Sequence, residues 1–386
     1  MWVGDNNDVA DVDESFNVNN KRKKKDNKVS LVIPANAITK ATSQVADRIE
    51  LSEIMENWLK EKPKYAVIHW DSKMIEFVTG KKEERVAIIV SGANSGPKVI
   101  GVPFIKDSTG LSQKDAVINV LETWQLTNNA IAMVFDTTAS NTGIRNGCAV
   151  LIECELKHSL LWLACRHHIY ETHIKNIWKA ITGATSGPDD LLFKGFKSQW
   201  GNLDHDNLDF KIFEWPSDEK SNIHIEATEV LKWAKECLAK DSFPRADYRE
   251  LLELTVIFLG GYLPASRKFR IRKPGAVPHA RFMSKNIYIL KMYLLSDHIE
   301  LDDEDYSTIK NMALFVSLFY TKVFLRSRIA CFAPIDDLKF IGAMTWYEKE
   351  CKEISGAAIT SCKRHLWYLT DELVVLCIFN ENLSDT

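Results

Sequence analysis

The fold is decided by four apolar stretches, Tyr65-Ala-Val-Ile-His-Trp70, Arg85-Val-Ala-Ile-Ile-Val90, Lys98-Val-Ile-Gly-Val-Pro-Phe-Ile105 and Ala130-Ile-Ala-Met-Val-Phe135. Each is short and rich in β-branched and aromatic residues, a composition typical of a β-strand. Gly, Asn, Ser and Lys separate the first three stretches at spacings suited to an antiparallel meander. The fourth is continuously apolar, as a buried strand is. We therefore predict three hairpin-joined strands and a buried fourth strand.

Helical patterns alternate with the later strands. Residues 112–126 place apolar side chains on one helical face, and the pattern then predicts a helix over about 144–157, a strand at 160–164 and a helix over about 166–180. A meander followed by alternating helices and parallel strands predicts a mixed α/β sheet with helices on its faces. This is the element order of the ribonuclease-H-like fold, and it makes the first and fourth strands neighbours.

The rest of the chain has a different pattern. After residue 182 we predict mostly helices, near 186–199, 225–240, 245–262, 279–296, 302–325, 335–350 and 363–379. We therefore divide the chain into four parts: a disordered tail with a basic run (1–44), the first part of the core (45–182), a large all-α insertion (183–350) and a returning helix (351–386).

The first 30 residues are polar and almost free of aromatic side chains, so ordering them would bury too little apolar area to offset the entropy lost. Within them, Lys21-Arg22-Lys23-Lys24-Lys25 is typical of a nuclear-localisation signal or a phosphate-seeking arm. A solvated run of charges with no further role is the alternative interpretation.

Composition excludes several classes of protein. Hydrophobic residues make up 46% of the 386 residues and charged residues 26%, as in a globular protein. The net charge of −3 means that any contact with nucleic acid must come from local basic patches. Eight widely spaced cysteines, with no secretory leader and no apolar run of about 18 residues, predict a cytosolic or nuclear protein with reduced thiols and no membrane segment.

Two aspartates directly follow predicted strands: Asp71 follows the first and Asp136 the fourth. Because those strands are neighbours, we expect the two carboxylates to lie side by side at one edge of the sheet. Two close carboxylates repel each other unless a cation lies between them, and hard oxygen ligands suit Mg²⁺ or Mn²⁺. Two such ions can activate a water or hydroxyl for phosphodiester chemistry. The alternative is that each Asp only caps a turn or helix after its strand.

Three segments resemble motifs of the hAT-type cut-and-paste DNA transposases. Asp136-Thr-Thr-Ala-Ser-Asn141-Thr-Gly143 is similar to that family's second-aspartate motif. Leu163-Ala-Cys165-Arg-His-His168-Ile-Tyr is similar to its Cys-x-x-His segment, and Ala280-Arg281-Phe-Met-Ser284 to its Arg-Trp-x-Ser segment. The interval from Asp71 to Asp136 also resembles the family's interval between its first two aspartates. The resemblance covers about residues 66–386.

The resemblance implies a ribonuclease-H-like catalytic core that uses Mg²⁺ to hydrolyse DNA phosphodiesters and to join the freed 3′ hydroxyl to target DNA. Asp71 and Asp136 would be metal ligands, and His168 a supporting group. The family's amino-terminal zinc finger has no counterpart, since residues 1–62 contain no Cys. We therefore expect a truncated or domesticated transposase in the nucleus, descended from a mobile element. The alternative is a catalytically silent module in which the same fold only docks DNA or a protein.

This mechanism needs a third carboxylate, which we assign to Glu372. It lies in the apolar segment 365–379, predicted to form a helix packed against the core, and it falls at the margin of the buried face. We predict that its carboxylate lies within metal-bridging reach of Asp71 and Asp136. Asp371 is the nearest rival, and a plain surface position for Glu372 is the alternative.

The densest basic stretch outside the tail is Arg267-Lys-Phe-Arg-Ile-Arg-Lys273. Its apolar residues, Phe269 and Ile271, alternate with the charges and predict a strand or extended loop with a buried face. Side chains of this kind neutralise backbone phosphates, so we predict DNA contacts from Arg267, Lys268, Arg270, Arg272, Lys273 and Arg281. A solvated charged face is the alternative, and the insertion is expected to bind DNA or a second copy of the chain.

Cysteine and histidine crowd between residues 148 and 173. A zinc site built on Cys165 and His168 is one interpretation, because these are the usual tetrahedral ligands. The spacings form no paired Cys-x-x-Cys or His-x₃-His unit, however. We therefore expect Cys165 to pack in the core and His168 to support the site or contact a phosphate.

Overall fold

A computed structural model describes residues 57–58, 62–76, 80–92, 95–183, 190–204, 208–263, 269–275, 282–327 and 332–365 of the protein. The chain divides into two compact units, Met1–Lys60 and Glu61–Thr386. The second unit holds the elements described below. The tail predicted to be disordered, residues 1–44, lies outside the described residues.

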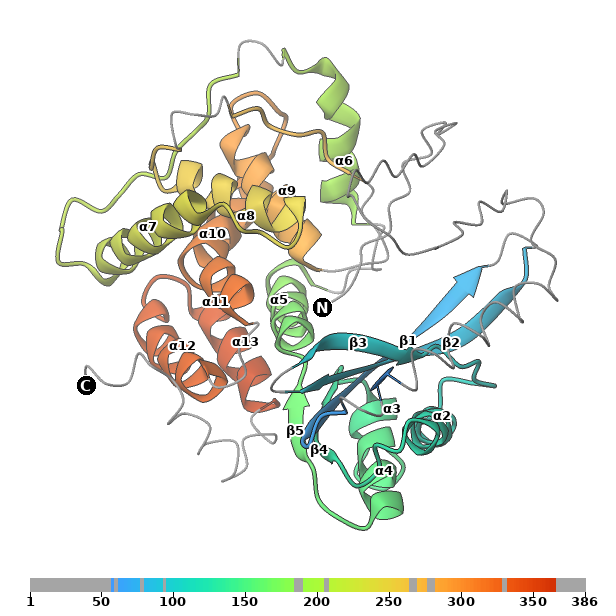
Figure 1. The fold of residues 1–386 in the computed structure, drawn as a ribbon. Helices are drawn as coiled ribbons and strands as arrows, with labels where there is room; N and C mark the ends of the chain where they lie inside the picture. Colours follow the sequence, from blue (N-terminus) through green and yellow to red (C-terminus); the bar gives the residue numbers. More distant parts are fainter. Residues whose placement is uncertain are drawn as a thin grey trace, which may run out of the picture. The chain divides into compact units, whose positions relative to one another are not determined.

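Five strands form one mixed sheet, which confirms the predicted α/β class (Figure 1). β1 (Ala66–Glu76), β2 (Lys82–Gly92) and β3 (Ser95–Gly101) form an antiparallel meander, as predicted. β4 (Ala130–Phe135) pairs in parallel with β1, and β5 (Leu161–Ala164) pairs in parallel with β4. The strand order is β3-β2-β1-β4-β5, so the first and fourth strands are indeed neighbours.

β1 is longer than the sequence pattern predicts. The apolar stretch ends at Trp70, but β1 continues to Glu76. Beyond Trp70 most side chains are exposed, while the backbone stays paired with β2 from Asp71↔Ala87 to Glu76↔Lys82. A solvated two-stranded arm keeps its ladder of hydrogen bonds without needing an apolar face. Asp71 therefore lies within β1 and not after its end, which corrects the prediction.

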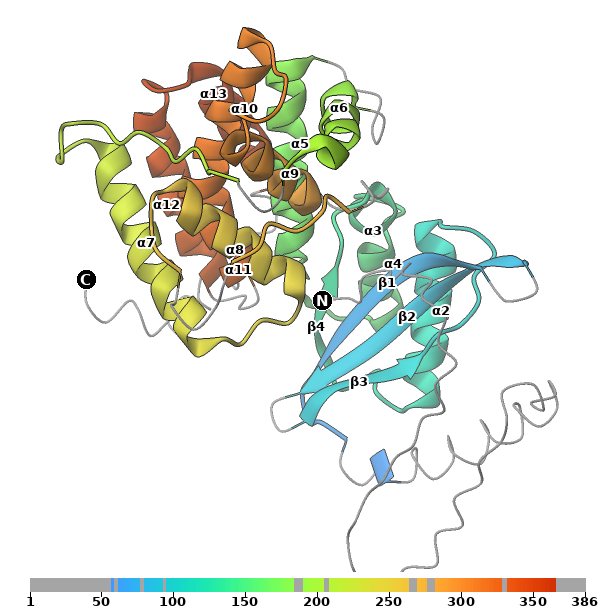
Figure 2. The same cartoon turned by 90° about the horizontal axis from the view of Figure 1, so that it is seen from above.

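Helices cover one face of this sheet (Figures 1 and 2): α2 (Gly110–Thr123), α3 (Ala139–Thr142) and α4 (Cys148–Leu156). The alternation along β1 fits this arrangement, since Ala66, Ile68 and Trp70 are buried and the residues between them are only half-buried. Side chains at every second position of a strand share one face. The core of the sheet therefore forms between this face and the three helices.

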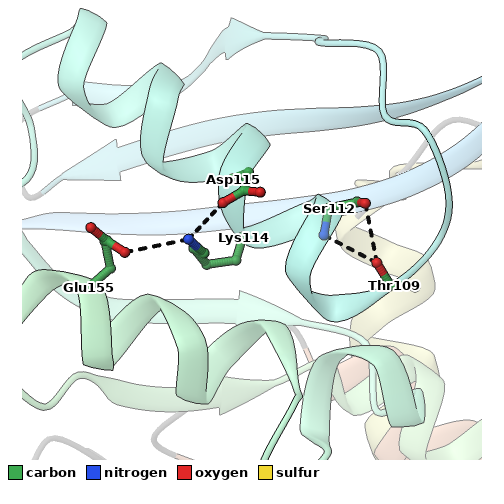
Figure 3. Close-up of polar contacts among 5 residues, drawn as sticks. All are labelled: Thr109, Ser112, Lys114, Asp115 and Glu155. Carbon is green, nitrogen blue, oxygen red and sulfur yellow. Dashed lines mark hydrogen bonds and ion pairs between the residues drawn. The ribbon is translucent and has the colours of Figure 1, made fainter.

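Polar contacts fix the start of α2 and join it to α4 (Figure 3). The Thr109 hydroxyl accepts a hydrogen bond from the Ser112 amide at 3.2 Å, as an N-cap residue does. Lys114 Nζ lies 2.6 Å from a carboxylate oxygen of Asp115 and 3.4 Å from one of Glu155 in α4. The two carboxylates are more than half exposed, so these ion pairs contribute little to stability.

The helix predicted over 144–157 begins only at Cys148, because a tight turn separates it from α3. Gly143 and Gly147 form this turn, and a Cβ built on Gly147 would lie 2.4 Å from the carbonyl oxygen of Gly143. No side chain fits so close to a backbone oxygen, so Gly147 has to be glycine. The turn delays the start of α4 and lets α3 form directly after β4.

From β5 onward the described residues are helical. The elements are α5 (Arg166–Thr182), α6 (Leu191–Gln199), a 3₁₀ turn (Trp200–Asn202), α7 (Asn222–Lys240), α8 (Ala246–Phe258), α9 (Phe282–Leu294), α10 (Asp303–Phe315), a π-helical turn (Val316–Tyr320), α11 (Thr321–Arg326), α12 (Ala333–Tyr347) and α13 (Lys352–Lys363). Side chains from α5 and the later helices share one large hydrophobic core, in which Trp178, Phe193 and Tyr293 are fully buried. α5 therefore connects the sheet directly to the helical core.

Two departures concern the later helices. α13 has no predicted counterpart, because its core side chains, such as Ala358 and Cys362, are small and give a weak periodic signal. Most of the helix predicted over 363–379 lies outside the described residues.

α10, the π-helical turn and α11 form one continuous run, Asp303–Arg326. Among the described residues this is the one helix long and apolar enough to cross a membrane by length and composition. That finding is weak evidence for a membrane segment, since 67% of its most apolar window is buried inside the protein, as in an ordinary core helix.

Candidate functional site

The pairing of β1 with β4 brings the two predicted aspartates together. His69 is paired with Val134 in parallel register, and two residues further along both strands come Asp71 and Asp136. Directly paired residues of parallel strands send their side chains to the same face of the sheet. Asp71 is exposed, and Asp136, the first residue after β4, is half-buried. Asp71 lies on the face opposite Ala66, Ile68 and Trp70, whereas the Asp136 side chain, beyond the end of β4, is hydrogen-bonded to Asn141 of α3 on the helix-covered side.

A set of donors holds the Asp136 carboxylate in one orientation. Its Oδ1 accepts hydrogen bonds from the Thr138 amide at 2.9 Å, the Thr138 hydroxyl at 2.6 Å and Asn141 Nδ2 at 2.8 Å. Its Oδ2 accepts none within the described part of the chain. Asn141 Oδ1 in turn accepts a hydrogen bond from the indole Nε1 of Trp70 at 2.9 Å. Among the described residues, hydrogen bonds therefore reach only one of the two oxygens of Asp136.

Sequence reasoning assigned no role to Trp70 or to Asn141. Both side chains are 4% exposed, and the Trp70 ring stacks on Phe135 with centroids 4.9 Å apart. The sequence did hold one indication of a role for Trp70, because a Trp on the buried face of a strand needs an acceptor for its indole N–H. Asn141 is a short polar residue in α3, the next element after β4, but sequence alone does not say that the two side chains meet.

His69 lies on the same face as Asp71, two residues earlier in β1. Its Nε2 is 2.8 Å from the Ser91 hydroxyl of β2. Burial lowers the pKa of His69 from 6.5 to about 4, because a buried imidazole is costly to charge. The imidazole is therefore neutral near pH 7.

Cys165 and His168 lie where β5 turns into α5. The Cys165 amide donates a hydrogen bond to the Phe135 carbonyl at 2.8 Å, which continues the β4–β5 pairing to the level of Asp136. Cys165 is half-buried, so it is less enclosed than predicted. His168 lies in the first turn of α5 and is also half-buried. Across the described ranges, no three His, Cys, Asp or Glu side chains are grouped closely enough to hold a metal ion.

A buried ion pair ties the start of α5 to α12, and the sequence did not predict it. Arg166 Nη1 donates to Asp337 Oδ2 at 3.0 Å, Nη2 also donates to Asp337 Oδ1, and the Tyr170 hydroxyl accepts from Nη2 at 2.7 Å. Arg166 is 6% exposed and Asp337 2%. Beside it, His167 Nε2 lies 3.1 Å from the Phe324 carbonyl oxygen of α11. The helical core thus holds the turn that carries His168.

The described part of the predicted basic segment, residues 269–275, is neither helix nor strand, and some of its side chains are buried. Ile271 and Pro274 are buried, while Arg270, Arg272 and Lys273 are exposed. Lys291 of α9 donates a hydrogen bond to the Arg272 carbonyl at 2.8 Å, which anchors the segment on the helical core. Three of the predicted DNA contacts are therefore presented to solvent. The other three, Arg267, Lys268 and Arg281, lie outside the described residues.

The predicted third carboxylate, Glu372, and its rival Asp371 also lie outside the described residues, so their assignment stays a prediction. No protein-family model and no curated protein matches this sequence.

Proposed function

We propose that this chain is the ribonuclease-H-like core of a hAT-like, transposase-derived protein that catalyses metal-dependent hydrolysis of DNA phosphodiesters and strand transfer. The observation that carries the proposal is the strand order β3-β2-β1-β4-β5, with Asp71 in β1 and Asp136 directly after β4, each two residues beyond the paired His69 and Val134. A meander next to two parallel strands is the sheet expected of that fold. The helices after α5 would then form the insertion that the family places within its core.

The donor set suits a hard divalent cation. Asp136 Oδ2 is left without a hydrogen-bond donor among the described residues, and Asp71 is exposed in the neighbouring strand β1. Carboxylate oxygens are the ligands that Mg²⁺ and Mn²⁺ prefer. Asp71, Asp136 and the third carboxylate that we assign to Glu372 would hold the ions. When bound, two such ions supply activation of the attacking oxygen and stabilisation of the leaving oxygen.

The chain's own residues supply the rest of the proposed chemistry. The hydrogen bonds to Asp136 Oδ1 hold that carboxylate in place before any cation arrives. Arg270, Arg272 and Lys273 are exposed and would neutralise DNA phosphates. His168 would support the strand end or contact a phosphate, and the Lys21–Lys25 run would direct the protein to the nucleus.

A plasmid-nicking assay tests the proposal without knowledge of a target sequence. Purified protein should nick supercoiled DNA in Mg²⁺ or Mn²⁺ and lose this activity in a chelator. Asp136→Ala and Asp71→Ala should abolish nicking, because each removes a ligand of the ions. Asp297→Ala is the matched control, since that exposed carboxylate is paired with Lys211 at 2.8 Å in the helical part. DNA binding without nicking, even in Mn²⁺, would identify the silent binding module instead.

A further inference from the structure

Two hydrogen bonds connect Trp70 to Asp136 through Asn141, and in each the donor is on the Trp70 side. The Trp70 indole donates to Asn141 Oδ1 at 2.9 Å, and Asn141 Nδ2 donates to Asp136 Oδ1 at 2.8 Å. Trp70 directly precedes Asp71, and the Asn141 side chain touches Asp136. The relay therefore links the strand that carries one aspartate to the carboxylate of the other.

The direction of this relay follows from the chemistry of the indole. An indole N–H donates and never accepts, whereas a primary amide has a donating and an accepting end. Trp70 therefore sets which end of Asn141 faces it, and the NH₂ group is left to face Asp136. Without the indole N–H the amide could turn and place its oxygen against the carboxylate, where two acceptors repel each other.

Packing keeps Trp70 from moving. Its ring stacks on Phe135 at 4.9 Å with an interplanar angle of 25°, and both side chains are nearly fully buried. Phe135 directly precedes Asp136, so the residues before the two aspartates are stacked on each other. The indole N–H consequently has a fixed position relative to Asn141, which donates to the Asp136 carboxylate.

We propose that Trp70 and Asn141 are positioning residues that orient the Asp136 carboxylate, so that Oδ1 is held by the protein and Oδ2 is presented to a divalent cation. This inference builds on the proposed function, since it concerns the same metal site. Groups that orient a metal ligand through hydrogen bonds typically contribute 10–100-fold to metal affinity. Neither residue touches the reacting atoms in this arrangement.

The test is a Mn²⁺ titration of the purified chain followed by electron paramagnetic resonance, which counts free Mn²⁺. Trp70→Phe keeps a ring on Phe135 but loses the indole donor, and we expect it to weaken Mn²⁺ binding about tenfold. Trp178→Phe is the matched control. Its indole is equally buried and donates to Asp190 Oδ2 at 2.8 Å in the helical core. The control should lose comparable stability and keep the parent's Mn²⁺ affinity.

A second readout follows the hydrogen bond itself. In ¹⁵N-tryptophan-labelled protein, Mg²⁺ should shift the indole resonance of Trp70 and leave that of Trp178 in place. If Trp70→Phe does not fold, the same titration is done with Asn141→Ala. This variant removes the Asn141 donor to Asp136 Oδ1 and leaves both hydrogen bonds from Thr138.

The outcomes separate the two proposals. Parent-like Mn²⁺ affinity in Trp70→Phe and Asn141→Ala would overturn the positioning role and leave the metal site intact. A parent protein that shows no Mn²⁺ binding dependent on Asp136 would overturn the proposed function, and the positioning role with it.

Discussion

Asp337 is the residue whose burial is hardest to explain without its partner. It is 2% exposed in α12, and Arg166 of α5 satisfies both of its oxygens. Breaking a buried pair leaves one uncompensated charge, which costs about 3–5 kcal/mol, whereas replacing both members by apolar residues is often neutral. We expect Asp337→Ala to lower the free energy of unfolding by about that amount. The double variant Arg166→Met/Asp337→Leu should recover most of it.

Urea denaturation followed by circular dichroism measures both variants. A double variant as unstable as Asp337→Ala would mean that the pair itself, and not the stranded charge, stabilises the start of α5.

His173 is a second buried residue with a measurable consequence. Burial, and then the facing charges of His365 and Arg166, lower the pKa of His173 from 6.5 to about 3. The unfolded chain therefore takes up a proton near pH 6.5 and the folded chain does not until about pH 3. Stability is complete above pH 6.5 and falls as the pH drops below it, by roughly 1.4 kcal/mol per pH unit.

Denaturation at pH 7, 6 and 5 tests this, with His173→Phe as the variant. Phenylalanine suits the site, because the His173 ring already stacks on Phe340 at 5.9 Å. The variant should show a flatter dependence of unfolding free energy on pH, and an unchanged slope would assign the acid sensitivity to another group.

At the scale of elements, the strands and helices that a local sequence pattern determines could be predicted. Those that depend on contacts with distant residues could not. The meander and the parallel strands follow from β-branched runs and turn residues, so the order of the strands could be predicted. The part of β1 beyond Trp70 could not be predicted, because it is held by backbone pairing with β2 and has no apolar pattern in its sequence. α13 was missed because small residues face the core.

The basic segment is the element with the most direct prediction for DNA. Arg270, Arg272 and Lys273 are exposed on a segment anchored by Ile271 and by the bond from Lys291. Removing one phosphate-binding cation should lower the magnitude of the slope of log K against log salt by about 0.9. Replacing all three cations with Gln should therefore weaken binding to duplex DNA and flatten its salt dependence.

Fluorescence anisotropy at several salt concentrations measures this effect. The matched control replaces the exposed lysines of α7 with Gln: Lys232, Lys235 and Lys240. Equal effects of the two triple variants would mean that net charge, and not this segment, determines DNA binding.

At the scale of the whole molecule, the candidate site is assembled from parts far apart in the sequence. The neighbouring strands that carry Asp71 and lead into Asp136 could be predicted, because each has an apolar stretch that ends at the residue before its aspartate. The Arg166–Asp337 pair could not, since 171 positions separate its members and nothing local marks either one as a partner. The identity of the third carboxylate also depends on which distant part of the chain returns to the two aspartates.

The path of the chain gives the prediction for Glu372 its physical basis. At His365 the chain has returned to α5, since the rings of His365 and His173 are 5.5 Å apart. α5 begins directly after Cys165, which is hydrogen-bonded to the residue before Asp136. Glu372 follows seven residues after His365 and lies outside the described residues, so its position near the two aspartates stays a prediction.

We therefore expect Glu372→Gln to abolish Mn²⁺-dependent nicking while leaving the affinity for duplex DNA unchanged, because it removes one ligand charge and keeps the side chain's shape. Asp371→Asn is the control for the rival carboxylate and should keep the parent's nicking rate. The reverse result would move the role to Asp371. Full activity in both variants would mean that the third ligand comes from elsewhere in the chain, since two aspartates alone leave a pair of ions under-coordinated.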